Sequence, residues 1–405
     1  MPTSPKRQRL AAPQTFDVCM PSLLKFGGGC SRQLPAVLQQ LGLRRPFIVT
    51  DAFITKSGLL GPITRSLADA QYSVSQFNGC VPDPTTDSIA EGLRSWKACG
   101  PDGARPDCMV AIGGGSSIDT AKAISLLAVH GGRMRDYKAP APVPAGLAVI
   151  AIPTTAGTGS EVTRATIITD VETSEKMLVM GFGCMPRAAL VDHELTLSMP
   201  YRLTADSGLD ALCHAMEAFV SKKHNAFSET HALAAMRAIP ANLRAVCADL
   251  SDEGAREALM TAATHAGIAF SNASVTLIHG LSRPIGAHFH VPHGLSNAML
   301  LPIVTEFSLP GAPSRYATCS RAMGFASEAD DDDAAGAQLL AGLRSLCAEL
   351  TVPSPCSYGI AEAEYSGLLE LMADQALASG SPNNNPVVPT KEQCVDLYKR
   401  VYKGV

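Results

Sequence analysis

Residues 108–130 read CMVAIGGGSSIDTAKAISLLAVH, a segment that contains three consecutive glycines. Its apolar start predicts a strand over 108–115, and the segment that follows has the composition of a helix. Between them, Gly113–Gly115 allow the backbone to approach a ligand closely, and the unpaired N–H groups of a helix that begins at Ser116 favour an anion. The stretch therefore predicts a phosphate-binding turn. A tight turn without a ligand is the alternative, because the spacing is neither GxGxxG nor GxxxxGKS/T.

Three more segments before residue 199 have the composition of buried strands: RPFIVTD (45–51), LAVIAIPTT (147–155) and AALVDH (188–193). Near-continuous apolar runs of this kind are typical of a parallel sheet that is covered on both faces. Helical stretches lie between them and supply the crossovers. We therefore expect residues 16–199 to form an α/β dinucleotide-binding domain.

After Met199-Pro200 the strand signal nearly vanishes, and residues 200–405 are expected to form an all-helical domain. The basic segment 1–15 is expected to be a flexible tail. The expected helices are Ala-rich and cover 204–222, 228–249, 253–273, 294–307, 333–350 and 361–378.

The composition of the 405 residues excludes some classes of partner. A formal charge of −4 gives no reason to expect nucleic acid or an anionic membrane, and no apolar run is long enough to span a bilayer. Twelve cysteines are scattered singly without a CxxC pair, which indicates reduced thiols and a cytoplasmic location. Organellar targeting by the short basic N-terminus is the alternative. We expect a small-molecule substrate.

Four residues have the spacing of one metal site. Asp210 and His214 stand four apart in a segment expected to be helical, so both side chains project from one face. His279 and His293 bound a histidine-rich segment. A carboxylate and three imidazoles suit a divalent first-row metal such as Fe(II), with Zn(II) as the alternative. A single histidine on an apolar helix face is more often a core residue, but four such residues together favour a metal.

Polar residues at other strand ends point to a cofactor. The segment PTTAGTGSEVT (153–163) offers the hydroxyls of Thr154, Thr155 and Thr158 next to glycines. Asp51 ends the strand 45–51, where an acid can bind ribose hydroxyls and repel a 2′-phosphate, which favours NAD over NADP. Capping of the next helix is the alternative role of Asp51.

Together these motifs resemble the iron-containing (group III) alcohol dehydrogenases, relatives of lactaldehyde reductase and 1,3-propanediol dehydrogenase. The resemblance covers residue 16 to the end and implies a dehydroquinate synthase-like fold, with NAD in the N-terminal domain and a metal between the two domains. It assigns the metal to the same four residues. The motifs in family order are FGGG (26–29), VPDPT (81–85), GGGSSIDTAK (113–122), PTTAGTGSEVT (153–163), LTLSMP (195–200), DALCHAMEAF (210–219) and HG…PHG (279–294). Within or near these motifs, the candidate cofactor contacts are Asp51, Asp83, Gly114, Gly115, Ser116, Asp119, Thr154, Thr155, Thr158 and Lys176.

Two positions depart from the family pattern. Asp83 replaces the asparagine of a PNPT turn, so an acid stands where a neutral amide could approach the cofactor. Arg283 stands four residues after His279, where many relatives carry another histidine. Arg283 and His290 are our candidate catalytic residues, with His288 as an alternative proton relay and a purely structural Arg283 as the rival interpretation.

The predicted activity is hydride transfer between a small alcohol and NAD(H), with the metal as a Lewis acid, in a homodimer or larger homo-oligomer. Glycerol dehydrogenases and dehydroquinate-synthase-like lyases share the two-domain plan and are the alternative enzymes. A nucleotide-binding protein without catalysis would be expected to have lost metal ligands, and all four are present.

Overall fold

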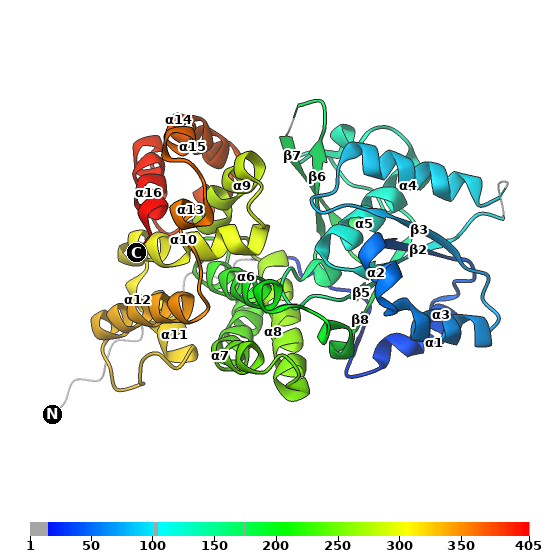
Figure 1. Ribbon diagram of the computed structural model, residues 1–405, viewed down its shortest axis with the longest axis horizontal. Coiled ribbons are helices and arrows are strands. Elements are labelled where there is room, and N and C mark those ends of the chain that lie inside the picture. Colours follow the sequence, from blue (N-terminus) through cyan, green and yellow to red (C-terminus); the bar gives the residue numbers. More distant parts are fainter. Residues whose placement is uncertain (1–14, 101–103, 174, 405) are drawn as a thin grey trace.

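The computed structural model describes residues 15–100, 104–173 and 175–404. The proposed tail, residues 1–15, lies almost entirely outside them. All strands lie before residue 192, and every element from Tyr201 onward is a helix. The prediction of an N-terminal α/β region followed by a helical region is thus confirmed, and Figure 1 shows the two regions side by side.

The α/β region is built on a six-stranded parallel sheet with the order β1-β8-β5-β4-β2-β3. The central strands β4 and β5 are paired over their full length, so that Gly113 and Pro153 end side by side. The turns that follow these strands therefore lie at one edge of the sheet. The strands are β1 (Leu23–Phe26), β2 (Pro46–Asp51), β3 (Ser75–Cys80), β4 (Cys108–Gly113), β5 (Ala148–Pro153) and β8 (Ala188–Val191). A separate antiparallel hairpin consists of β6 (Ala165–Asp170) and β7 (Glu175–Met180).

Helices cover both faces of this sheet, as the apolar strands require. On one face, Leu34, Ile63 and Leu67 pack against strand residues such as Ile48 and Val110. On the other face, the helix that follows the glycine turn buries nearly its whole length. The helices of this region are α1 (Leu34–Leu41), α2 (Ala52–Ser57), α3 (Leu60–Asp69), α4 (Thr86–Ala98) and α5 (Gly115–His130).

The helical region is organised around α6, which is buried over most of its length and contacts α7, α8 and α10. The remaining helices pack outward from this centre (Figure 1). Their bounds are α6 (Tyr201–Val220), α7 (Ala226–Ala248), α8 (Glu253–Ser271), α9 (Leu277–Phe289), α10 (His293–Ser308), α11 (Pro313–Ala322), α12 (Asp332–Glu349), α13 (Pro355–Tyr358), α14 (Glu362–Gly367), α15 (Leu369–Ala378) and α16 (Lys391–Lys403). None of the helices in the described residues is both long and apolar enough to cross a membrane.

The four predicted strands and six predicted helical segments are present, with one difference. The single helix expected over 361–378 is two helices, α14 and α15, which meet at Gly367 and Leu368. A glycine weakens helix propagation, which accounts for the break at this point. All twelve cysteines are free thiols.

Candidate metal and cofactor site

The structure brings the four candidate metal ligands together. Asp210 and His214 project from α6, His279 lies in the first turn of α9, and His293 is the first residue of α10. One potential ligand atom from each residue lies within 4.8 Å of all the others. Oδ1 of Asp210 is 3.6 Å from Nε2 of His279 and 3.8 Å from Nε2 of His293. Residues up to 83 positions apart thus converge on one point.

A glycine allows this convergence. Gly294 follows His293, and a β-carbon at this position would lie 2.5 Å from the backbone oxygen of Asp206 and 3.3 Å from Cβ of Asp210. Any larger residue would push α10 away from α6. The start of α10 can therefore rest directly on the ligand-bearing face of α6.

Three of the four side chains in the cluster are buried. The side chains of Asp210, His214 and His279 are 3%, 5% and 4% exposed, whereas that of His293 is 41% exposed. Solvent and substrate therefore reach the cluster from the side of His293. The ring of His214 is held between Phe270 and His279, with ring centroids 4.2 and 4.5 Å away.

The charges within the cluster are strongly coupled. Burial disfavours ionised Asp210, but the surrounding histidines outweigh this effect and hold the pKa of its carboxyl well below the usual value. Burial lowers the pKa of His214 to about 3, and partial burial together with the positive charges of His279, Lys176 and Arg283 lowers the pKa of His293. The site therefore presents a carboxylate and two unprotonated imidazoles at neutral pH.

His279 is oriented by a residue that sequence reasoning missed, Glu217. This carboxylate accepts hydrogen bonds from Oγ1 of Thr276 (2.8 Å), the backbone N–H of Ile278 (2.6 Å) and Nδ1 of His279 (2.5 Å). Burial opposes protonation of His279, but the charge of Glu217 and the hydrogen bonds to both acids raise its pKa to about 9. With Nδ1 bound to Glu217, Nε2 faces Asp210, which is the arrangement found around metal-binding histidines.

Asn297 is the second residue that sequence reasoning missed. Its Nδ2 donates a hydrogen bond to Oδ1 of Asp210 (2.7 Å) and lies 3.1 Å from Nε2 of His279 and 3.3 Å from Nε2 of His293. Its buried Oδ1 has no hydrogen-bond partner in the described structure. Both missed residues stand on the same helix face as a ligand, Glu217 three residues after His214 and Asn297 four after His293. This spacing is the signal that could have revealed them.

The residues present fit a divalent metal ion. They offer one carboxylate oxygen and three imidazole nitrogens, a donor set that suits Fe(II) or Zn(II). Nδ1 of His214 is buried without a hydrogen-bond partner in the described structure, which is expected if this ring serves to bind a metal.

The predicted cofactor loops lie against each other at the end of β4 and β5. A β-carbon at Gly114 would be 3.5 Å from Oγ1 of Thr155, and one at Gly115 would be 3.0 Å from Oγ1 of Thr158. The backbone N–H of Thr154 donates to the carbonyl of Gly113 (3.1 Å). The two loops thus pack against each other beside the first turn of α5, where Ser116 lies and where free N–H groups favour a phosphate.

Asp51 lies beside the glycine turn and also caps a helix. Its Oδ1 accepts a hydrogen bond from the N–H of Ile54 (2.8 Å), so the capping interpretation is confirmed. Its Oδ2 lies 3.6 Å from the position of a β-carbon at Gly113. One oxygen is thus used by the cap while the other faces the glycine turn, and its contact with a ribose stays a prediction.

The other three candidate cofactor residues are engaged with the protein. Nζ of Lys176 lies 3.1 Å from Oδ1 of Asp83, and Asp83 has a positive φ of 49°. Asp119 accepts hydrogen bonds from Oγ of Ser160 (2.6 Å) and from the N–H of Ile167 (2.9 Å). Asp119 therefore holds the loop that carries the threonines, and direct cofactor contacts of these three residues stay predictions.

The two candidate catalytic residues lie on or next to α9. Arg283 stands one helical turn after His279, with its side chain partly buried. His290 is exposed at the C-terminal end of the helix with a φ of 54°. His288 is hydrogen-bonded to Gln375 (2.9 Å). The catalytic roles of Arg283 and His290 stay predictions.

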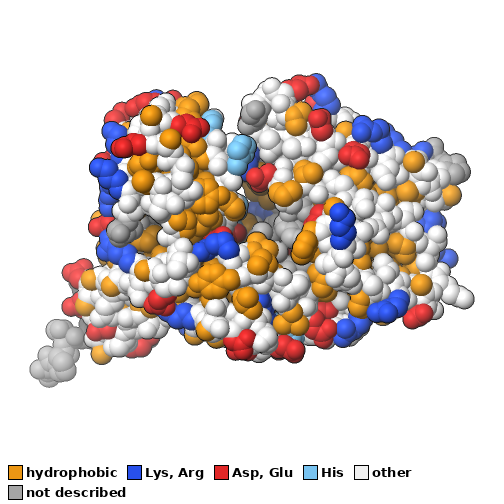
Figure 2. Space-filling model, viewed as in Figure 1, with side chains coloured by type: hydrophobic (Ala, Val, Ile, Leu, Met, Phe, Trp, Pro, Cys, Tyr) orange, Lys and Arg blue, Asp and Glu red, His pale blue; other side chains and the backbone are white. Residues whose placement is uncertain are grey.

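The segments that carry the candidate cofactor residues contact the helices that carry the metal ligands. A β-carbon at Gly157 would lie 2.7 Å from Cβ of Ser207, which is three residues before Asp210 on α6. Lys176, on the hairpin β6–β7, lies against α9, because its Nζ is 3.7 Å from the position of a β-carbon at Gly286. Figure 2 shows a cleft between the two regions, with histidine side chains at its mouth.

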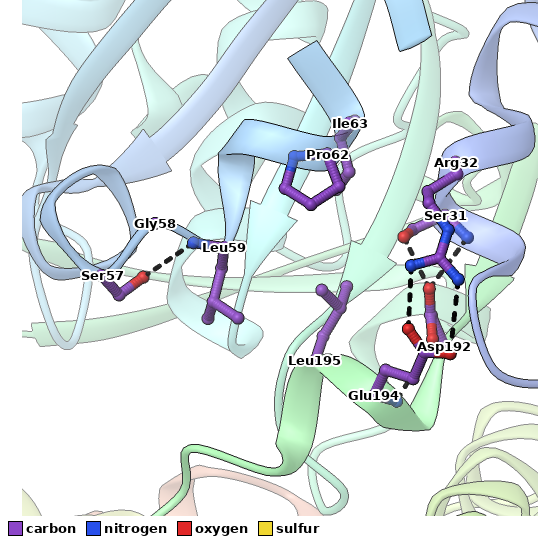
Figure 3. A pocket seen from close by; sticks show the side chains of 10 residues that line it. All are labelled: Ser31, Arg32, Ser57, Gly58, Leu59, Pro62, Ile63, Asp192, Glu194 and Leu195. Atoms are coloured by element: carbon purple, nitrogen blue, oxygen red, sulfur yellow. Dashed lines mark hydrogen bonds and ion pairs between the residues drawn. The ribbon is translucent and has the colours of Figure 1, made fainter. Parts of the chain in front are cut away.

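A separate pocket of about 310 Å³ lies within the α/β region (Figure 3). Arg32 pairs with Glu194 at its edge. The other residues that line it are Ser31, Ser57, Gly58, Leu59, Pro62, Ile63, Asp192 and Leu195. The carboxylate of Asp192 is already bound to the N–H groups of Gly29 and Ser31. This pocket contains none of the predicted site residues.

Both regions of the chain match models of one family of oxidoreductases. Residues 21–193 match the family model described as iron-containing alcohol dehydrogenase, and residues 204–402 match that of the C-terminal part of the Fe-containing alcohol dehydrogenase family. The NAD-dependent methanol dehydrogenase of Bacillus methanolicus is 34% identical over 382 residues, which cover 94% of this chain and 98% of that protein.

Solved structures agree. A crystal structure of 1,3-propanediol oxidoreductase has a TM-score of 0.91 and 29% identity, covering 96% of this chain and 100% of that one. Sulfoacetaldehyde reductase from Bifidobacterium kashiwanohense, in complex with NAD+, has a TM-score of 0.84 and 26% identity, covering 96% and 99%.

The chain belongs to the iron-containing alcohol dehydrogenase family. The predictions of an oxidoreductase of the alcohol dehydrogenase class, with iron and NAD(H) as the cofactors of its family, are confirmed.

Proposed function

We propose that this protein interconverts short primary alcohols and aldehydes with NAD(H), using iron held by Asp210, His214, His279 and His293. The observation that carries the proposal is the convergence of one ligand atom from each of these residues within 4.8 Å. The similarity to methanol dehydrogenase and 1,3-propanediol oxidoreductase supports a small alcohol as substrate.

We place the dinucleotide in the crevice between the glycine turn and the threonine loop. The support is the direct packing of Gly114 and Gly115 against Thr155 and Thr158, next to the first turn of α5. A pyrophosphate there would meet free backbone N–H groups. The free oxygen of Asp51 would accept ribose hydroxyls and oppose a 2′-phosphate, so the preferred coenzyme is NAD(H).

The chain's own residues position the reacting groups. Glu217 fixes the ring of His279 and directs its Nε2 into the cluster, while Asn297 holds the carboxylate of Asp210. The exposed side of His293 leaves the approach for substrate. When bound, iron supplies a Lewis acid toward the substrate oxygen, and NAD(H) supplies the hydride acceptor or donor.

Removal of the metal tests this function. Enzyme treated with a chelator should lose NADH consumption with short aldehydes and regain it when Fe(II) is added without oxygen. His279→Ala should lower kcat/KM on the order of a thousandfold, because metal catalysis supplies several kcal/mol. The matched control is His231→Ala, which removes a histidine of α7 that pairs with His265 of α8 and is not part of the cluster. Full activity in metal-free protein or in His279→Ala would refute the proposal.

We further propose two domains, 16–199 and 200–405, behind a tail of residues 1–15, in a cytoplasmic homodimer. The strand β1 supports the dimer, because it lies at the edge of the sheet and Phe26 on it is 45% exposed. Light scattering of the purified protein tests the dimer, and a monomer would contradict it.

A further inference from the structure

Arg283 is a partly buried cation without an acid partner. No residue within 15–100, 104–173 or 175–404 makes a hydrogen bond or an ion pair with its guanidinium, whereas Arg202 and Arg315, also partly exposed, pair with Asp206 and Glu229. Burial lowers the pKa of Arg283, and only the charge of Glu217 opposes this. A cation withdrawn from water is costly unless a counter-charge meets it.

Glu217 does not serve as that partner. Its carboxylate is already shared by the donors of Thr276, Ile278 and His279. An arginine held in this place without a protein partner therefore has its hydrogen-bonding groups free for something that enters the cleft.

A second cation lies on the same side of the cluster. Lys176 rests against α9 at Gly286, three residues beyond Arg283. Both cations lie near enough to His293 to act on its ring electrostatically. Lys176 has a partner in Asp83, but Arg283 has none among the described residues. Arg283 is therefore the cation near His293 whose charge no described acid neutralises.

A divalent metal would sharpen this imbalance. Like charges a few ångströms apart repel each other strongly in a partly buried site. The acids of the cluster, Asp210 and Glu217, are already bound to Asn297 and His279, and neither forms an ion pair with Arg283 among the described residues. An anion placed between the metal and the guanidinium would relieve the repulsion.

We propose that Arg283 selects short aldehydes and alcohols that carry a second, anionic group, a carboxylate or a sulfonate, near the carbonyl or hydroxyl. The guanidinium would bind the anion through two parallel N–H···O bonds while the reacting oxygen lies at the metal cluster. This inference rests on the proposed function, because it requires the reacting carbon to lie at that cluster.

The test compares substrates that differ only in charge. The metal-loaded enzyme is assayed with NADH on butanal against 4-oxobutanoate, and on acetaldehyde against sulfoacetaldehyde. In the wild type, at least one anionic aldehyde should have the higher kcat/KM, by on the order of 10- to 100-fold, as expected for a hydrogen-bonded charge pair. The two pairs show whether a carboxylate or a sulfonate is preferred.

Variants assign this preference to the guanidinium. Arg283→Gln should lower kcat/KM for the preferred anionic aldehyde by the same factor and for its neutral counterpart far less, and Arg283→Lys should keep part of the preference. The matched control is Arg237→Gln, which removes an exposed arginine from α7 and should change neither. The dissociation constant of NADH, measured by its fluorescence, should stay the same in Arg283→Gln.

Several results would overturn the inference. These are a wild type that prefers both neutral aldehydes, an equal loss on both members of a pair, or weaker NADH binding, which would assign Arg283 to the cofactor. If Arg283→Gln does not fold, inhibition of the wild type tests the inference instead. Butyrate and ethanesulfonate, which carry an anionic group, must then inhibit aldehyde reduction competitively and more strongly than neutral butyramide. Activity on neutral aldehydes alone overturns only this inference, whereas inactivity on all four aldehydes overturns the proposed function as well.

Discussion

Replacement of Glu217 by glutamine is expected to weaken metal binding without removing a metal ligand. The carboxylate accepts three hydrogen bonds, and a glutamine amide oxygen can still accept those from Thr276 and Ile278. The amide nitrogen would then face Nδ1 of His279, which the carboxylate now meets at 2.5 Å. A donor at this place favours the tautomer with the proton on Nε2, the nitrogen that faces Asp210.

The expected loss of metal affinity follows from this reversed hydrogen bond. Removal of the partner that orients a metal-binding histidine typically costs 10- to 100-fold in metal affinity, about 1.4–2.8 kcal/mol. The metal affinity is measured by competition with a chelator at fixed pH. Glu161→Gln is the matched control, because Glu161 is equally buried and accepts a hydrogen bond from Thr264 (2.8 Å) outside the cluster. Wild-type metal affinity in Glu217→Gln would refute the reasoning.

Three further changes test other parts of the site. Gly115→Ala should raise the KM for NADH about tenfold, because its β-carbon would lie 3.0 Å from Thr158. Gly61→Ala is the control and should leave this KM unchanged, because Gly61 on α3 has open space around it. Equal KM values in the two variants would contradict the placement of the cofactor. Asp51→Asn keeps an efficient helix cap but removes the charge, so kcat/KM for NADPH relative to NADH should rise about tenfold. A wild type that already prefers NADPH would show that the role of Asp51 is misassigned. Metal binding must displace a proton from His279, because the pKa of this residue is raised to about 9. Metal affinity should therefore rise with pH between about 6.5 and 9, by up to tenfold per pH unit. A metal affinity that does not change with pH would contradict this prediction.

The pair of metal ligands on α6 could be predicted because its geometry is local. Asp210 and His214 are four apart on one helix, so their convergence follows from the helical repeat alone. The docking of His279 depends on α9, which was not among the expected helices because it contains Pro284 and two glycines. Its stability comes from burial against neighbouring helices, which intrinsic helix propensity does not capture.

The remaining contacts depend on tertiary packing. Glu217 meets His279 only after α9 packs beside α6, and Lys176 reaches Asp83 only because the hairpin β6–β7 returns toward the turn after β3. The strand β3, with the sequence SQFNGC, has little apolar character and was not expected. Its position is determined by parallel pairing with β2, a long-range interaction.

The location of the metal is the central claim, and anomalous X-ray diffraction at the iron absorption edge measures it directly. Crystals of protein loaded with Fe(II) without oxygen should show one anomalous peak per chain, within about 2.0–2.2 Å of a carboxylate oxygen of Asp210 and of one nitrogen each from His214, His279 and His293. A peak at any other place, or none in protein that is active, would contradict the account.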